Sequence, residues 1–129
     1  MSKHIAGPVC ASCEEKLKLA KTELVEWFHD LKIRNPSCHV SWSYRDQASQ
    51  EDAFATGHTR LHFPQSAHNK MPSEALDIFQ INDQGQAIFD PIFCAKVAQE
   101  IRDAKLPIIW GGTFKSLGDN DHFQYHTDT

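Results

Sequence analysis

The sequence predicts an α+β fold in one domain. Three segments have the apolar spacing or the capping residues of helices, and four short segments have the alternation or the apolar run of strands. Turn-forming residues separate these segments, and no repeat or low-complexity tract interrupts them. A chain of 129 residues suits one compact domain. We therefore assign residues 1–129 to a single domain, with an N-terminal extension over residues 1–11.

Helix and strand signals alternate in the first half of the chain. The spacing of a capping box at Ser12 begins a helix predicted over residues 12–30. The apolar residues at helical spacing are Leu17, Ala20, Leu24, Trp27 or Phe28, and Leu31. Alternation predicts a strand over residues 39–44. Asp46 is expected to cap a second helix that ends at Gly57, because glycine readily adopts the left-handed conformation that follows a helix.

The second half of the chain begins with a predicted loop over residues 58–73, which prolines and small polar residues punctuate. Residues 75–81 then predict a strand. Pro91 suits the first position of a third helix, which continues to about Lys105. Two further short strands are predicted, over residues 108–110 and 122–125.

The composition excludes several classes of function. The chain has 13 Lys and Arg against 17 Asp and Glu, which gives a net charge of −4 with histidine neutral. It contains no basic block, so we expect it to bind neither nucleic acid nor a membrane. No apolar run reaches the roughly eighteen residues of a membrane span, and the start of the sequence lacks the apolar region of a secretory signal. We therefore expect cytoplasmic synthesis without a signal peptide.

Asp77 stands out because it interrupts an apolar strand. An isolated buried carboxylate is very unfavourable, so Asp77 must be paired, protonated or bound to a metal, and a salt-bridged or solvated strand end is the alternative. His68 lies in the loop before this strand, and His122 begins the last strand. Two histidines and one aspartate with an open position are ligands typical of catalytic zinc. Asp119, three residues before His122, is placed to act as a general base.

Three sequence signatures resemble those of a known family of zinc peptidases. Residues 66–69 and 72–77 are similar to S-x-H-N…P-S-x-A-x-D, and residues 110–123 match W-G-G-x-[WF]-x-x-x-x-D-x-x-H-F. The third signature, S-x-Y-R-x-x-x-x-Q, matches Ser41 or Ser43, Tyr44, Arg45 and Gln50. The family comprises phage-type L-alanyl-D-glutamate endopeptidases and D-Ala-D-Ala carboxypeptidases, which cut the peptide part of bacterial peptidoglycan. The resemblance covers about residues 12–125.

The resemblance implies a fold and a metal. The fold is the hedgehog/D-Ala-D-Ala peptidase-like one, a small antiparallel sheet flanked by helices with the zinc site at the sheet. Carried over by position, His68, Asp77 and His122 become the ligands of one catalytic Zn²⁺ ion. Nine positions separate His68 from Asp77, whereas the shorter form of the family has seven, so the longer loop indicates a different subfamily.

The resemblance also implies roles for residues around the metal. Asp119 becomes the catalytic base. Arg45 is expected to hold a substrate carboxylate or to stabilise negative charge on the scissile carbonyl, with support from Gln50. Asp121 adds negative charge at a position where the family often has a neutral residue, and Trp110 is expected to form a wall of the cleft.

Other histidines and the cysteines offer alternatives. His126 competes with His122 for the ligand role, but we expect it to be an exposed residue near the end of the chain. His58 and His62 have no motif support and are expected at the surface or facing substrate. A second, structural zinc site could have as ligands Cys10, Cys13, Cys38 and His39 or His29. We do not favour it, because the spacing of these residues is an incomplete zinc-binding pattern. Cys94 is expected in a helix core.

The sequence therefore predicts a zinc metallopeptidase that acts on the stem peptide of bacterial peptidoglycan. The favoured function is an L-alanyl-D-glutamate endopeptidase of the phage endolysin type, a monomer that acts on the cell wall after release. A D-Ala-D-Ala carboxypeptidase or dipeptidase is the alternative within the same chemistry. A non-catalytic, zinc-stabilised wall-binding or virion module is the alternative from another class, although Arg45 and Asp119 favour an enzyme.

Overall fold

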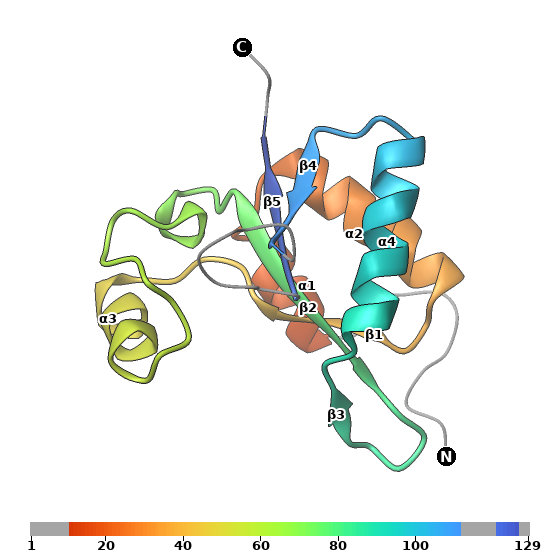
Figure 1. Cartoon of the computed structure of the whole chain (residues 1–129), viewed down its shortest axis with the longest axis horizontal. Helices are drawn as coiled ribbons and strands as arrows, with labels where there is room; N and C mark the ends of the chain where they lie inside the picture. The colour runs from red at the N-terminus through yellow and green to blue at the C-terminus, as the bar shows by residue number, and fades with distance from the viewer. Residues whose placement is uncertain (1–10, 112–120, 127–129) are drawn as a thin grey trace.

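The structure is a computed structural model that describes residues 11–111 and 121–126 (Figure 1). The helices are α1 (Ala11–Leu17), α2 (Thr22–Arg34), α3 (Gln47–Ala55), the 3-10 helix η1 (Ala67–Asn69) and α4 (Pro91–Asp103). The strands are β1 (Cys38–Trp42), β2 (Ala75–Ile81), β3 (Ala87–Ile88), β4 (Ile108–Trp110) and β5 (His122–Tyr125). This arrangement confirms the predicted α+β fold. None of the described helices has the length and apolar character needed to cross a membrane.

The strands form one antiparallel sheet in the order β1-β2-β5-β4, and the short β3 also pairs with β2. In this register, Asp77 on β2 lies opposite His122 on β5 and opposite Trp42 on β1. Directly opposed residues project from the same face of a sheet. The pairing of β2 with β5 therefore brings the Asp77 and His122 side chains together, although 45 positions separate them in the sequence.

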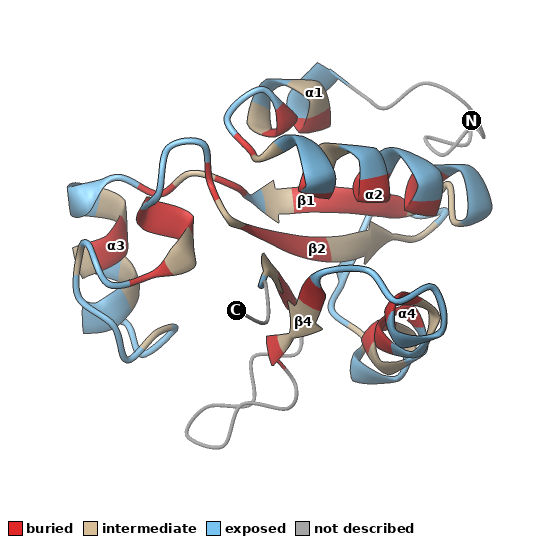
Figure 2. Ribbon diagram, turned by 90° about the horizontal axis from the view of Figure 1, so that it is seen from above, coloured by how far each residue is buried: buried red, intermediate tan, exposed pale blue. Residues whose placement is uncertain are grey.

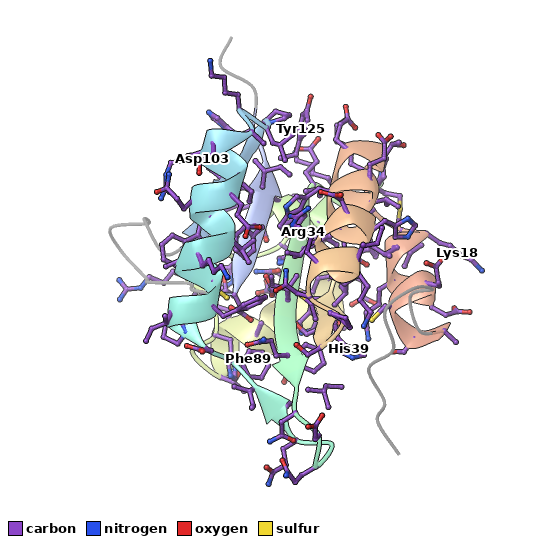
Figure 3. The ribbon with its side chains drawn as sticks, turned by 90° about the vertical axis from the view of Figure 1, so that its right-hand side faces the viewer. Lys18, Arg34, His39, Phe89, Asp103 and Tyr125 are labelled. Atoms are coloured by element: carbon purple, nitrogen blue, oxygen red, sulfur yellow. The ribbon has the colours of Figure 1, made fainter. Side chains whose placement is uncertain are left out.

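Helices α2 and α4 lie side by side over one face of the sheet (Figures 1 and 3). The alternation along β2 turns the fully buried Leu76 and Ile78 to this face and Asp77 to the opposite face. In the core, the Trp27 ring of α2 packs against Phe123 of β5 with centroids 5.1 Å apart. Helix α3 lies at the end of the sheet away from α4 (Figure 2). The site face and the core face of the sheet are thus separate.

The single helix predicted over residues 12–30 is wrong, because the chain forms α1 and α2 with a break between them. At the break, the Ser73 N–H donates to the Leu19 carbonyl at 2.7 Å, and the Lys21 N–H donates to the Ser73 carbonyl at 2.8 Å. These bonds replace the helical ones, so tertiary pairing overrides the local helical pattern. The capping box at Ser12 is also wrong, because Ser12 lies inside α1.

The broken helix has a structural consequence, because α1 packs against the edge strand β1. The thiol of Cys13 accepts a hydrogen bond from the Val40 N–H at 3.4 Å. An edge strand exposes unpaired backbone groups that can pair with another chain. Helix α1 covers one of these groups.

The other predicted elements are close to the observed ones. The Asp46 side chain caps α3 by accepting from the Ser49 N–H at 2.8 Å, and Gly57 follows with φ of +81°. Strand β2 has the predicted bounds, and α4 begins at Pro91 as predicted. The two-residue strand β3 was not predicted, because its alternation is too short to be seen in the sequence.

Candidate metal centre

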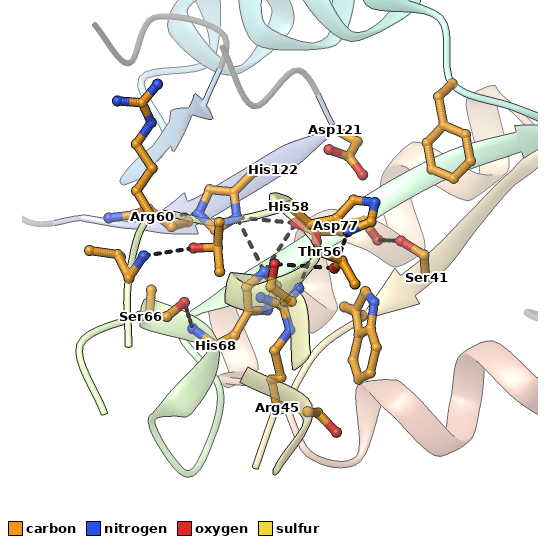
Figure 4. Close-up of a pocket in the computed structure, with 18 of the residues that line it drawn as sticks. Ser41, Arg45, Thr56, His58, Arg60, Ser66, His68, Asp77, Asp121 and His122 are labelled. Atoms are coloured by element: carbon orange, nitrogen blue, oxygen red, sulfur yellow. Dashed lines mark hydrogen bonds and ion pairs between the residues drawn. The ribbon is translucent and has the colours of Figure 1, made fainter. Parts of the chain in front are cut away.

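His68, Asp77 and His122 meet on the face of the sheet opposite the helical core (Figure 4). His68 Nε2 lies 3.0 Å from Asp77 Oδ1, and His122 Nδ1 lies 3.1 Å from the same oxygen. The two nitrogens are 3.2 Å apart. All three side chains are buried. Within residues 11–111 and 121–126, they are the one group of three such side chains that could hold a metal ion.

Local structure fixes the position of His68. The Ser66 side chain accepts from the His68 N–H at 3.2 Å, and the Asn69 side chain accepts from the Ser66 N–H at 3.0 Å. These two bonds form a capping box around η1. The Ser66 and Asn69 side chains therefore hold His68 in a rigid turn, while Asp77 and His122 are held by the paired strands β2 and β5.

The outer nitrogen of each histidine faces an acceptor. His68 Nδ1 lies 2.6 Å from the Ser43 carbonyl oxygen, and His122 Nε2 lies 2.9 Å from Gln124 Oε1. Each acceptor favours a proton on the nitrogen that faces it, so the inner nitrogen presents its lone pair to the centre of the group. This arrangement is typical of histidines that bind metals.

The charge of Asp77 is also fixed by its surroundings. Burial of the carboxyl opposes ionisation, but the charges and hydrogen bonds that His68 and His122 supply when protonated outweigh burial and hold the pKa of Asp77 below its usual range. A metal ion bound among the three side chains would supply the positive charge in place of those protons. The carboxylate is thus ionised at neutral pH, as a metal ligand must be.

These donors fit a divalent metal ion. Nitrogen and oxygen atoms bound to tetrahedral zinc at about 2.0–2.1 Å lie about 3.3 Å from one another, slightly more than the separations seen among the three ligand atoms. All three side chains also line a cleft of about 820 Å³. Three protein ligands beside an open cleft are typical of catalytic zinc sites, whereas structural sites have four.

Arg45 lies directly behind Asp77. The Arg45 side chain is buried, and its Nη2 is 3.5 Å from Asp77 Oδ2, the oxygen that faces away from the histidines. The guanidinium also lies over the Trp42 ring at 5.0 Å from the centroid. Among the described residues, Arg45 Nε is a buried donor without a hydrogen-bond partner.

Gln50 of α3 joins Arg45 to the loop that carries His68. Gln50 Oε1 accepts from Arg45 Nη1 and from Asn69 Nδ2, both at 3.2 Å. Gln50 Nε2 donates to the Leu61 carbonyl at 2.6 Å, and the Arg45 N–H donates to the His68 carbonyl at 2.8 Å. The network therefore fixes the guanidinium, α3 and the metal-binding turn relative to one another.

The remaining predicted site residues have different positions. Asp119 and Cys10 lie outside the described residues. Asp121 and His58 line the cleft. His62 instead pairs with Glu51 at 2.7 Å, and His126 is exposed beyond β5.

The structure does not assemble a second metal site among the described cysteines. Cys13 Sγ lies 3.5 Å from His39 Nδ1 in a buried pair, and Cys38 and Cys94 are buried free thiols. Trp110 packs against the core and is not among the described residues that line the cleft, so its predicted role as a cleft wall is wrong. The tryptophan in the wall is Trp42.

Two residues behind the ligands were not singled out from the sequence as supports of the histidines. Gln124 lies two positions after His122 on the same strand, and alternation places both side chains on one face. That spacing was a usable signal. The Ser43 carbonyl carried no signal, because any residue has a carbonyl and only the fold directs this one toward His68.

Comparison with known proteins supports the fold. No protein-family model matches the chain, and no curated protein does. Among solved structures, the chain is similar to the L-Ala D-Glu endopeptidase ChiX of Serratia marcescens, with 26% sequence identity and a TM-score of 0.68. The similarity covers 89% of this chain and 86% of the other. The architecture is thus that of a peptidase, with the His–Asp–His group at the sheet.

Proposed function

We propose that this protein is a zinc-dependent peptidoglycan peptidase that hydrolyses the L-alanyl-D-glutamate bond of the stem peptide. The observation that carries the proposal is the buried group of His68, Asp77 and His122, whose ligand atoms lie close together beside an open cleft. The similarity over most of the chain to an L-Ala D-Glu endopeptidase supports the choice of substrate.

Each ligand has a definite task in this proposal. His68 and His122 supply neutral nitrogen donors, because their protons face Ser43 and Gln124. Asp77 supplies the one negative charge, and Arg45 holds its second oxygen. Bound zinc supplies a Lewis acid that polarises a carbonyl and makes water a stronger nucleophile at neutral pH.

Arg45 has a second task in the proposal. Its guanidinium keeps its positive charge at any pH of interest, and its Nε has no described hydrogen-bond partner. We infer that this side chain stabilises negative charge that develops on the scissile carbonyl, while Gln50 fixes its orientation. Asp119 remains the proposed general base, on the strength of its place in the sequence signature.

The biological setting belongs to the proposal as well. The phage endolysin type rests on the sequence signatures, and so does action on the wall after release from the cytoplasm. A D-Ala-D-Ala carboxypeptidase uses the same metal chemistry on a different bond, and the experiment below distinguishes the two. We propose that the protein acts as a monomer.

Digestion of purified peptidoglycan tests the proposal. The zinc-loaded protein is incubated with the wall polymer, and the new termini are identified by mass spectrometry. New amino termini on D-glutamate are expected, with loss of the activity on chelation and return on addition of zinc. Free D-alanine would instead establish the carboxypeptidase. If neither product appeared while one zinc ion was bound per chain, the enzymatic proposal would be wrong and a binding module would replace it.

A further inference from the structure

The cleft extends beyond the metal ligands to two exposed aromatic side chains, Trp42 and Phe89. Both line the cleft, and 41% of Trp42 and 57% of Phe89 remain exposed. Large apolar side chains exposed together in a cleft commonly mark a ligand site. No task in the proposed metal chemistry uses Phe89, and Trp42 enters that chemistry only by packing against Arg45.

Each of these rings is supported on one side. The Trp42 ring packs against the Arg45 guanidinium, and the Phe89 ring stacks on Phe79 with centroids 5.5 Å apart and an interplanar angle of 23°. Phe79 lies two positions beyond Asp77 on the same face of β2, so the Phe89 end of the cleft continues directly from the metal ligands. Supported rings present a fixed apolar surface at little cost in conformational entropy.

The aromatic end of the cleft is acidic. Burial, together with the charges of Asp121 and Asp90, raises the pKa of the Cys94 thiol to about 12, which indicates that both carboxylates lie near this side chain. Asp90 directly follows Phe89. Asp90, Cys94 and Asp121 all line the cleft. Figure 4 shows Asp121 and Ser41 on one side of the metal ligands and Arg60 and Ser66 on the other. The Phe89 end of the cleft is therefore acidic, whereas the other end carries the Arg60 side chain; Asp52 and Arg45, which packs on Trp42, also line the cleft.

The two sides of the proposed scissile bond differ in charge, as the two ends of the cleft do. D-Glutamate is linked through its side chain and keeps a free carboxylate next to this bond. L-Alanine is joined through its nitrogen to the lactyl group of N-acetylmuramic acid, whose carboxyl is consumed in that amide. The sugar side is therefore neutral, and a pyranose ring has an apolar C–H face and polar hydroxyls. Such a ring suits an aromatic surface with carboxylates at its edge, whereas a carboxylate would be repelled there.

We propose that Trp42 and Phe89 bind the N-acetylmuramoyl sugar of the glycan strand and that the Arg60 end of the cleft receives the carboxylate of D-glutamate. This inference rests on the proposed function and adds a recognition site for carbohydrate. The protein then prefers wall peptides that are still attached to the glycan over free peptides of the same sequence.

The test compares two substrates that differ only in the sugar, an N-acetylmuramoyl and an N-acetyl peptide that begin with L-Ala-D-Glu. The kcat/KM of the zinc-loaded protein is expected to be about tenfold higher for the muramoyl peptide. Phe89→Ala should bring this ratio close to one, whereas Phe89→Tyr, which keeps the ring, should retain it. Phe54→Ala is the matched control, because Phe54 is also an exposed phenylalanine stacked on a neighbour but does not line the cleft.

A binding measurement keeps the outcome separate from the proposed activity. N-acetylmuramoyl-L-alanine and N-acetyl-L-alanine contain no L-Ala–D-Glu bond, and calorimetry can compare their affinities for the wild type and Phe89→Ala. Preferential binding of the muramoyl compound that Phe89→Ala abolishes supports the sugar site, even if neither peptide is cleaved and the proposed function fails. Equal affinities, or a preference that Phe89→Ala leaves unchanged, would overturn the sugar site even if both peptides are cleaved.

Discussion

The protonation of the site histidines is decided by atoms behind them. The Ser43 carbonyl and the Gln124 side chain each face the outer nitrogen of one histidine, at 2.6 and 2.9 Å. Without these acceptors, either nitrogen of each ring could carry the proton, and part of the population would be unable to bind a metal. We therefore expect the metal affinity of the group to depend on residues that would not touch the ion.

Gln124→Leu tests this dependence. The change removes the acceptor of the His122 proton and should lower the zinc affinity by about 10–100-fold. The matched control is Gln80→Leu, because Gln80 is also a half-buried strand glutamine but bonds to Ser37 away from the site. Titration against a chelating dye measures both affinities. Equal affinities in the two variants would mean that Gln124 does not orient His122.

Cys38 gives a second prediction at this scale, for alkaline pH. Burial raises the pKa of this thiol from 9.0 to about 12, so the folded protein keeps the proton while the unfolded chain loses it. The raised folded pKa stabilises the protein below pH 9, and this contribution is lost as the pH rises from 9.0 toward 12. Cys38→Ala should therefore reduce the slope of unfolding free energy against pH by about 1.4 kcal/mol per pH unit in this window.

Denaturation in urea at a series of pH values measures that slope. Val40→Ala is the control, because it also removes buried volume from β1 but no titrating group. If Cys38→Ala and the wild type lost stability in parallel above pH 9, the buried thiol would not be the cause.

At the scale of elements, the two faces of β2 have different roles: one packs in the core and the other contributes to the candidate metal site. Its Leu76 and Ile78 side chains enter the helical core, and Asp77 between them faces the metal site. Leu76→Ala should lower the free energy of unfolding by about 2–5 kcal/mol, because it leaves a cavity in a fully packed core. Ile88→Ala on β3 should change it by about 0.5 kcal/mol or less, because Ile88 is exposed.

Urea denaturation measures these changes, and zinc titration of the folded variants measures the site. Both variants should still bind one zinc ion per chain. Loss of zinc binding in folded Leu76→Ala would show that the two faces of β2 are coupled.

The elements that local signals define were predictable, and those that tertiary pairing defines were not. The strand over residues 75–81 has turn residues on both sides and was predicted with its observed bounds. The break between α1 and α2 was missed, because the distant Ser73 pairs with the backbone there and the local sequence does not show this contact. Asp77 and His122 were predicted to share a site, but their antiparallel pairing and the position of Arg45 behind Asp77 depend on the folded sheet.

At the scale of the whole molecule, the candidate metal site joins three separate segments of the chain. Nine positions separate His68 from Asp77, and 45 separate Asp77 from His122. The unfolded chain cannot hold these donors together, so the proposed zinc ion would bind the folded state, and we expect it to raise the melting temperature. At a free zinc concentration about a thousandfold above Kd, the stabilisation is about 4 kcal/mol. His122→Ala should abolish this shift, and His126→Ala, which removes an exposed histidine, should retain it.

The most direct test of the central claim is the metal content of the purified protein, measured by elemental analysis after dialysis against zinc. The wild type and His126→Ala should each hold one zinc ion per chain. His68→Ala, Asp77→Ala and His122→Ala should hold none, with their folded state checked by circular dichroism. A wild type without zinc, or folded variants of the three ligands that keep it, would contradict the assignment of His68, Asp77 and His122 as the metal centre.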